Sequence, residues 1–364
     1  MAMPPIIGHD AILRELRALA GAEPPPHALL LAGPESTGRM ALAREYAKLL
    51  NCEQLRGGGS QGGFDLGLAE PGRTDGTPCG ACRACRLIAD GTHPDVVVLS
   101  PGDMLCKPRA GEAHASHPQS RDIRICQVRG TIDLVARFPY EGRFRVVIIE
   151  PADRITVDAA NTMLKTLEEP PTQSVFVLIS AAPENLLETI VSRCRRIDVR
   201  PVATWIIEAG LAAQGIDPAT AKAAAAAARG RPGLAIAYAA KPDLMGDRER
   251  LLKRCARVAA SPLQERLRYA DELSTRWRGD KDRAGILREL ETWEQFWEED
   301  LRRTAAIGDE EGGREAVTAL TTVSRAREYL LANCLARTVF DFMLMTFPER
   351  RLGEGGEEFA ETDD

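Results

Sequence analysis

Four apolar runs mark the first half of the chain, and each is bounded by polar or glycine-rich residues. They lie at residues 27–32, 96–99, 146–149 and 175–179, and the last three are rich in β-branched side chains. Such runs are typical of buried strands. Stretches with helical spacing, such as Asp158–Glu168, alternate with them. This alternation predicts an α/β domain whose parallel sheet is covered by helices on both faces.

The pattern changes after Arg200-Pro201, where the apolar runs give way to alanine-rich helical stretches. We therefore expect an α/β domain at residues 1–200, a small helical domain at 201–245 and a larger helical domain at 246–347. A helix break at Gly230–Gly233 divides the small domain. The final stretch, residues 348–364, is acidic and predicts a disordered tail.

Two apolar stripes with helical spacing lie in the larger helical domain. We expect both to pack in its core rather than to form a platform for stacking bases, because their members recur at steps of three and four. The first stripe is Ile286, Leu290, Trp293, Trp297 and Leu301, and the second is Leu331, Leu335, Val339, Phe342 and Met345.

Composition and charge narrow the class of protein. Hydrophobic residues make up 44% and charged residues 27% of the 364 residues, which is typical of a globular chain. The net charge is −6, so the chain lacks the basic surface of a protein that binds DNA alone. Neither a signal sequence nor a membrane-spanning run is present, and we expect a cytoplasmic protein without membrane contact.

A phosphate-binding loop is suggested between the first apolar run and the helical stretch that follows it. Gly33 and Gly38 have the spacing of such a loop. Arg39, however, stands where a lysine should reach the β and γ phosphates, and Met40 stands where a hydroxyl should hold Mg²⁺. We expect no productive binding of ATP and Mg²⁺, because a thioether is a poor ligand for a hard cation. An ordinary turn is the alternative interpretation.

The third apolar run should end in a second acidic motif. An Asp-Glu pair at this place would bind the metal and orient the attacking water, but the sequence has Glu150-Pro151. Proline cannot activate water, so we expect no ATP hydrolysis at this site.

Four of the nine cysteines predict a metal site. Cys79, Cys82 and Cys85 form a C-x-x-C-x-x-C run, and Cys52 lies upstream of it. Four thiolates suit tetrahedral Zn²⁺ in a structural role. An iron–sulfur cluster or a set of unrelated thiols remain alternatives.

The other cysteines are isolated, and packing explains them best. They are Cys106, Cys126, Cys194, Cys255 and Cys334. His114 and His117 indicate a solvated loop.

Taken in order, these motifs resemble the clamp-loader subunits of bacterial DNA polymerase III over residues 5–201. Gamma and tau subunits, which hydrolyse ATP, keep the Lys-Thr of the loop and the Asp-Glu of the second motif, so the chain is more similar to the delta-prime group. The further segments that carry the resemblance are Gly91–Asp95, Ile123-Arg124, Gln127–Arg129, Asn161–Pro171 and Ser192–Cys194.

The resemblance implies an AAA+ domain with an inserted zinc module at about residues 52–85, followed by an all-α lid and an all-α collar. It implies a non-hydrolysing subunit of the polymerase holoenzyme that assembles with gamma/tau and delta subunits. Arg193, between Ser192 and Cys194, would then supply an arginine finger to the ATP of an adjacent subunit. Ser180 would occupy the place of a polar sensor. The assembled complex would load the sliding clamp onto primed DNA.

Three alternatives remain open. The chain could bind ATP and hydrolyse it slowly through Arg39 and Glu150. Its cysteine module could bind DNA directly, although the acidic balance counts against this. Arg193 could belong to an ordinary ion pair. For the remaining residues that the resemblance singles out, a structural role is expected; they are Thr92, His93, Lys165, Glu168 and Glu169.

Overall fold

The computed structural model describes residues 6–56, 76–102, 106–107, 120–278 and 282–348. It divides into two compact units, Met1–Ala240 and Lys241–Asp364. In the described ranges, no helix has both the length and the apolar character that crossing a membrane requires.

The first unit contains a five-stranded parallel sheet. Its strands follow the order β2-β3-β4-β1-β5, and every residue of β1, β3 and β4 is buried. The parallel sheet predicted from the apolar runs is confirmed. The strands are β1 (Ala28–Ala32), β2 (Val96–Leu99), β3 (Arg145–Ile149), β4 (Ser174–Ser180) and β5 (Arg195–Asp198).

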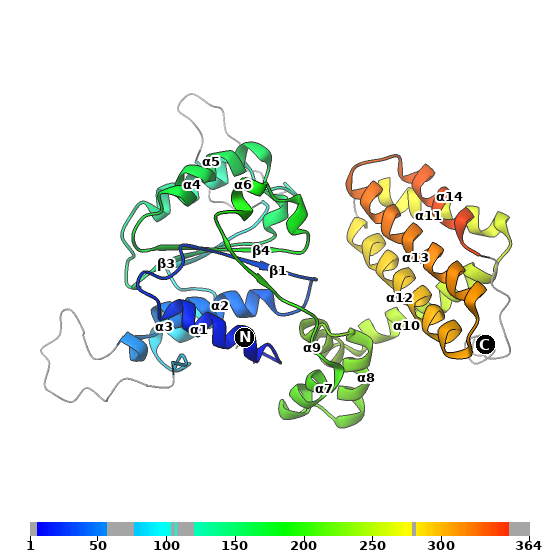
Figure 1. The fold of residues 1–364 in the computed structure, drawn as a ribbon, viewed down its shortest axis with the longest axis horizontal. Coiled ribbons are helices and arrows are strands. Elements are labelled where there is room, and N and C mark those ends of the chain that lie inside the picture. Colours follow the sequence, from blue (N-terminus) through cyan, green and yellow to red (C-terminus); the bar gives the residue numbers. More distant parts are fainter. Residues whose placement is uncertain (1–5, 57–75, 103–105, 108–119, 279–281, 349–364) are drawn as a thin grey trace, which may run out of the picture. The chain divides into compact units, whose positions relative to one another are not determined.

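Helices cover both faces of this sheet (Figure 1). Alternate strand residues point to opposite faces, so Leu29 and Leu31 belong to one apolar cluster and Leu30 belongs to the other. The first face carries α1 (Asp10–Ala20), α2 (Arg39–Asn51) and α3 (Arg83–Asp90), and the second carries α4 (Ile125–Val135), α5 (Val157–Glu168) and α6 (Glu188–Val191). Short 3-10 helices lie at η1 (Glu53–Arg56), η2 (Ala152–Arg154) and η3 (Pro183–Asn185).

A buried polar cluster fixes the segment that enters β3. The Asp95 carboxylate accepts hydrogen bonds from the backbone N–H groups of Tyr140, Glu141 and Gly142, and from Arg145 at 2.8 Å. The Asn51 side chain, at the end of α2, pairs with Phe144 in both directions. Burial alone would raise the pKa of Asp95, but its donors hold that pKa at about 2.

His93 belongs to the same cluster. It is buried, its Nδ1 accepts the backbone N–H of Asp95 at 3.1 Å, and its Nε2 lies 3.8 Å from Glu141. These contacts are those of a residue that caps a turn.

Three more helices complete the first unit. They are α7 (Thr204–Ala213), α8 (Pro218–Ala228) and α9 (Pro232–Ala240), and they pack around Ile207, Leu211 and the alanines of α8. Gly230 adopts a left-handed conformation (φ +80°) before α9, where the glycine pair predicted a helix break.

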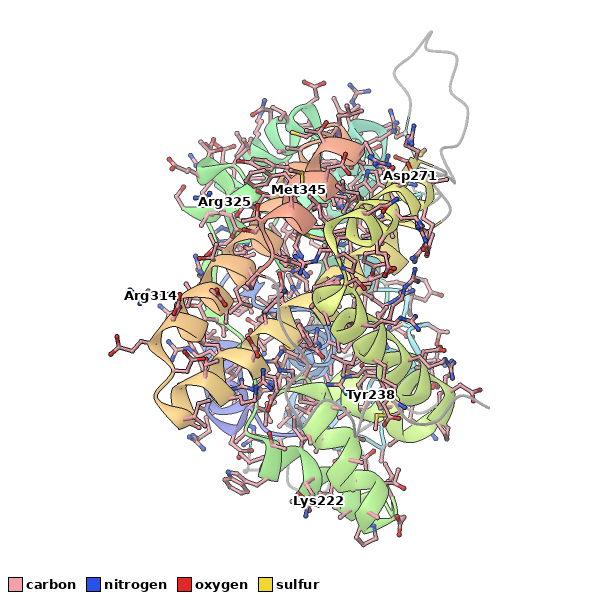
Figure 2. The ribbon with its side chains drawn as sticks, turned by 90° about the vertical axis from the view of Figure 1, so that its right-hand side faces the viewer. Lys222, Tyr238, Asp271, Arg314, Arg325 and Met345 are labelled. Atoms are coloured by element: carbon pink, nitrogen blue, oxygen red, sulfur yellow. The ribbon has the colours of Figure 1, made fainter. Side chains whose placement is uncertain are left out.

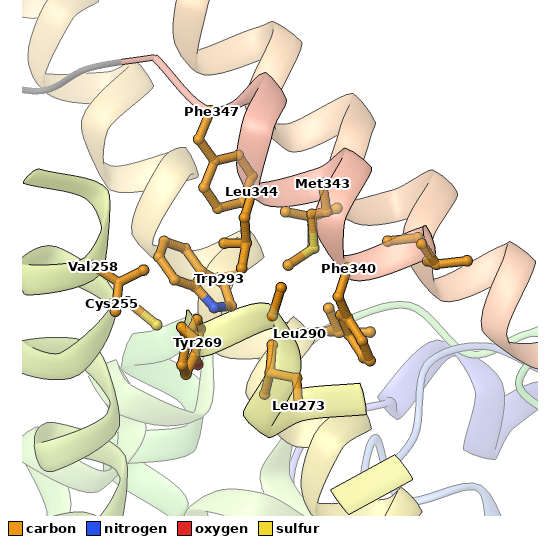
Figure 3. Close-up of a cluster of buried hydrophobic side chains, with 14 of the residues drawn as sticks. Cys255, Val258, Tyr269, Leu273, Leu290, Trp293, Phe340, Met343, Leu344 and Phe347 are labelled. Carbon is orange, nitrogen blue, oxygen red and sulfur yellow. The ribbon is translucent and has the colours of Figure 1, made fainter. Parts of the chain in front are cut away.

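The second unit is entirely helical in its described residues. It comprises α10 (Pro242–Ala260), α11 (Leu263–Arg278), α12 (Arg283–Ile307), α13 (Glu310–Leu331) and α14 (Ala336–Thr346). Trp293 and Trp297 are fully buried, and their ring centroids lie 4.9 and 5.2 Å from that of Phe347. Figure 3 shows Trp293 and Phe347 in this cluster. Ile286 and Leu290 are buried with them, so the first predicted stripe is confirmed as core.

The second predicted stripe is only partly correct, because Val339 is buried in the core but its other members are exposed. Leu335, Phe342 and Met345 are 54–69% exposed, whereas Phe340 and Met343 are fully buried. Both faces of α14 are apolar, so its sequence alone does not decide which one packs inward. Figure 2 labels Met345 on this helix.

We predict that Asp95→Asn lowers stability by about 2–3 kcal/mol at pH 7. Because the folded pKa lies below the unfolded value of about 4, the charged form stabilises the fold above pH 4 and this contribution is lost as pH falls toward 2. Urea unfolding at several pH values measures it. Asp90→Asn, at an exposed position at the end of α3, is the matched control. An unchanged pH profile in Asp95→Asn would contradict the role of this carboxylate.

Candidate functional site

The loop between β1 and α2 keeps the backbone of a phosphate-binding loop. Gly33 is required by close packing, because a Cβ there would lie 2.1 Å from the carbonyl oxygen of Val199. Gly38 has φ +101° and forms the N-cap of α2, a conformation that L side chains rarely adopt. Both predicted glycines are therefore explained by the backbone itself.

Contacts from three directions hold this loop in place. Thr37 is buried, and its hydroxyl donates to the carbonyl of Pro34 at 2.8 Å. His9 Nε2 lies 2.8 Å from the carbonyl oxygen of Thr37. The backbone N–H of Gly233, in α9, donates to the carbonyl of Ser36 at 2.8 Å. The loop is thus tied to the start of α1 and to the helices that follow the sheet.

Arg39 and Met40 occupy very different surroundings. Arg39 is 7% exposed, and its Nη1 has no hydrogen-bond partner among the described residues. Burial lowers the pKa of its guanidinium, and the negative charges of Glu150 and Asp153 partly offset this decrease. Met40 is partly buried and packs against the apolar cluster of the α1–α2 face. Its thioether contributes to the core instead of to a metal site.

Acidic and polar side chains follow β3 and β4 at the same edge of the sheet. Burial raises the pKa of Glu150, while Arg39 and Arg44 lower it. The Ser180 hydroxyl donates to Asp153 Oδ1 at 2.8 Å. Sequence reasoning missed Asp153, because it lies in η2 and its partner Ser180 lies 27 residues further along the chain, in β4. At this edge Ser180 is therefore occupied by Asp153, and Pro151 stands in the place of a second carboxylate.

Arg193 lies in a short segment after α6. Its Nη1 donates to the carbonyl of Thr189 at 2.8 Å and its Nη2 to Glu168 at 2.5 Å. The Arg193 side chain is 33% exposed and that of Glu168 is 49% exposed. Ion pairs at this exposure contribute only about 0–1 kcal/mol, so the guanidinium can exchange partners at little cost.

The neighbours of Arg193 have other contacts. Ser192 bonds its own helix through the carbonyl of Thr189, and Cys194 is partly buried, which raises the pKa of its thiol to about 12. Arg195 pairs with Glu15 and Arg196 pairs with Asp198. Arg193 is therefore distinguishable from the two arginines beside it.

The four predicted cysteines converge on one point. The sulfurs of Cys52, Cys79, Cys82 and Cys85 all lie within 4.8 Å of one another. Cys52 follows the end of α2 and Cys82 is the N-cap of α3, so the cluster joins two helices of the same face. Such spacing matches the sulfur positions of a tetrahedral four-cysteine site.

Backbone groups of the cluster are also arranged for thiolates. The N–H groups of Cys79, Cys82 and Cys85 donate to the sulfurs of Cys52, Cys79 and Cys82 at 3.2–3.4 Å. Such donors stabilise negative charge on sulfur. The cluster can hold a metal ion. His114, His117 and most of the acidic tail lie outside the described residues.

The sequence of this chain was compared with those of known proteins and protein families. Residues 66–203 match the model of the family described as DNA polymerase III, delta subunit. The delta' subunit of DNA polymerase III from Pseudomonas aeruginosa is 37% identical over 176 residues, which is 48% of this chain and 44% of that protein. The Bacillus subtilis delta' subunit is 31% identical over 196 residues, or 54% of this chain and 49% of the relative.

Further matches include a tau subunit and a solved structure. The tau subunit of DNA polymerase III from Bacillus subtilis is 28% identical over 56% of this chain and 30% of its own length. A gamma subunit-related protein from Thermotoga maritima aligns over 92% of this chain and 97% of its own, at 16% identity and a TM-score of 0.41. The matches to the curated delta' relatives cover under half of their length. Over the matched part of its sequence, the chain is similar to the delta' subunits of DNA polymerase III.

Proposed function

We propose that this chain is the non-hydrolysing delta-prime subunit of a bacterial clamp loader. In this role it assembles with gamma/tau and delta subunits, and the complex uses ATP to load the sliding clamp onto primed DNA. The first unit is then an AAA+ domain with its lid, and the second unit is the collar. The observation that carries the proposal is a phosphate-loop backbone kept intact around Arg39 and Met40, in a chain similar to delta' subunits.

The surroundings of Met40 support the absence of hydrolysis. Its side chain packs against the core, so neither its position nor its chemistry suits Mg²⁺. Glu150 is followed by Pro151, and Ser180 is engaged by Asp153. Pro151 therefore stands where a second carboxylate would orient an attacking water.

The exposure of Arg193 supports a role in a neighbouring site. A weak surface ion pair with Glu168 holds the guanidinium without committing it. A guanidinium offers two parallel hydrogen bonds to the charge that develops on a transferred phosphoryl group. Arg193 would supply these hydrogen bonds, and its positive charge, to the ATP of an adjacent subunit.

The four-cysteine cluster supports a structural Zn²⁺. All four ligand positions are filled by thiols of the chain, which leaves no open position for catalysis. The metal would hold the end of α2 against the start of α3. An iron–sulfur cluster is the alternative occupant of the same thiols.

A second candidate function is slow ATP binding and hydrolysis by the chain itself. The buried Nη1 of Arg39 favours it, because this donor has no partner among the described residues and can donate a hydrogen bond to a bound anion. Turnover by the purified chain that is abolished by Gly38→Val would favour this second function.

We predict that the purified protein contains about one Zn²⁺ per chain. Cys82→Ser should lose the metal and lower Tm by about 5 °C or more, because the site would lose a ligand. Elemental analysis and thermal unfolding measure both. Cys334→Ser changes an exposed thiol outside the cluster and is the matched control. A Cys82→Ser protein that keeps its metal and its Tm would contradict the assignment, and an iron signal would point to a cluster.

We predict that the chain alone hydrolyses ATP no faster than background. The single change Arg39→Lys should not restore turnover, because Met40 and Pro151 remain. A coupled phosphate-release assay on both proteins provides the measurement. Turnover in Arg39→Lys would show that Pro151 is no obstacle.

We predict that Arg193→Ala leaves folding and assembly unchanged but lowers the ATPase rate of the assembled complex severalfold. Arginine fingers contribute ~10³–10⁵ in rate at their own site, and the steady-state loss is smaller because only the adjacent site loses its arginine. Arg193→Lys should rescue poorly, since an ammonium lacks the planar fork.

Clamp-stimulated ATPase and clamp loading are compared at equal complex concentration, with Arg195→Ala as the matched control. Equal rates for the wild type and Arg193→Ala would exclude the role in trans. A loss confined to Arg195→Ala would assign that role to Arg195.

A further inference from the structure

A second group of thiols lies outside the metal cluster. Cys126 is in the first turn of α4 and is 5% exposed, and Cys106 lies in the connection that leads from β2 to this helix. Their sulfur atoms are 3.6 Å apart. Nineteen residues separate them in the sequence, so only the fold brings the two thiols together.

Neighbouring contacts hold the two thiols close. The backbone N–H of Lys107 donates to the carbonyl of Cys126 at 2.9 Å, and the Lys107 ammonium pairs with Asp133 further along α4. Gln127, next to Cys126, donates from its side chain to the carbonyl of Ser100 at 3.0 Å. Ser100 and Lys107, which follow β2, are therefore both bonded to α4. The second of these contacts joins the residue after Cys106 to Cys126 itself.

We propose that Cys106 and Cys126 are a redox-active pair that forms a reversible disulfide by exchange with a low-molecular-weight disulfide such as oxidised glutathione. The partly exposed Cys106 thiolate attacks one sulfur of the reagent and releases one reagent thiol. The Cys126 thiolate then attacks the Cys106 sulfur and releases the second. Two protein thiols lose two electrons and two protons, and one reagent disulfide becomes two thiols.

Ligand number argues for a disulfide rather than a metal at this pair. Zn²⁺ in a structural site takes four ligands, and the pair supplies two. In the described part of the chain, only the cluster of Cys52, Cys79, Cys82 and Cys85 brings three or more metal-binding groups together. Two sulfurs already in contact need only a short movement to reach the bonding distance of about 2 Å.

The bond would constrain a segment that adjoins the edge described above. Ile123, just before α4, pairs with Ile155, and its N–H donates to the carbonyl of Arg154 at 2.8 Å. Arg154 ends η2, the turn that carries Asp153. A disulfide at Cys126 therefore restrains the helix that supports this turn. In a reducing compartment the bond forms only under oxidative conditions.

The test treats the full-length, metal-loaded protein with oxidised glutathione and maps its disulfides by peptide mass spectrometry, with metal content measured in parallel. We expect a Cys106–Cys126 linked peptide with the loss of two hydrogen masses, full metal retention, and reversal by dithiothreitol. The oxidised protein should melt about 2–8 °C higher than the reduced one, because the bond closes a loop in the unfolded chain.

Variants separate the pair from other thiols. Cys106→Ser and Cys126→Ser should each abolish the linked peptide and the shift in Tm, whereas Cys334→Ser should keep both, since it changes an exposed thiol elsewhere. Cys106→Ser keeps the test valid if the more buried Cys126→Ser protein folds poorly.

Two results would overturn the proposal. One is a stable mixed disulfide with glutathione at Cys106 while Cys126 remains a thiol. The other is a second metal ion per chain that is lost in Cys106→Ser, which would assign the pair to a metal.

Discussion

The central strand β1 is the constraint on which the candidate site depends. It is fully buried and hydrogen-bonded to β4 on one side and to β5 on the other, so that Ala32 lies opposite both Ser180 and Asp198. Because all five strands are parallel, their carboxyl ends meet at one edge of the sheet. The loop after β1, Glu150 after β3 and Ser180 at the end of β4 must converge there, whatever chemistry their side chains possess.

This constraint separates the shape of the site from its chemistry. Gly33 and Gly38 are required by the close approach of Val199 and by a left-handed backbone, so replacing them would disturb the fold. Nothing in the backbone requires a lysine or a hydroxyl at the next two positions. Met40 even adds apolar contact with the core. The loop can therefore keep its spacing while the side chains that would bind Mg²⁺ and phosphate are replaced.

Local pattern predicted most of the first unit, and long-range contacts account for what it missed. The apolar runs at 96–99 and 146–149 lie within one residue of the bounds of β2 and β3. The edge strand β5 was missed, because three of its four residues are charged and only Ile197 is buried. On α14 the exposed Phe342 and the buried Met343 are both apolar, so their burial depends on how α14 packs against α11 and α13.

The cysteines also show which sites can be predicted from the sequence and which cannot. Cys79, Cys82 and Cys85 were recognisable because a metal needs several ligands at short spacing, which leaves a local signature. Cys106 and Cys126 have no such signature and read as isolated residues, yet their sulfurs lie 3.6 Å apart. Asp153 and Ser180 are a polar example of the same kind. A site can be predicted from the sequence when its chemistry requires residues that are close together along the chain. It cannot be predicted in this way when only the fold brings its residues together.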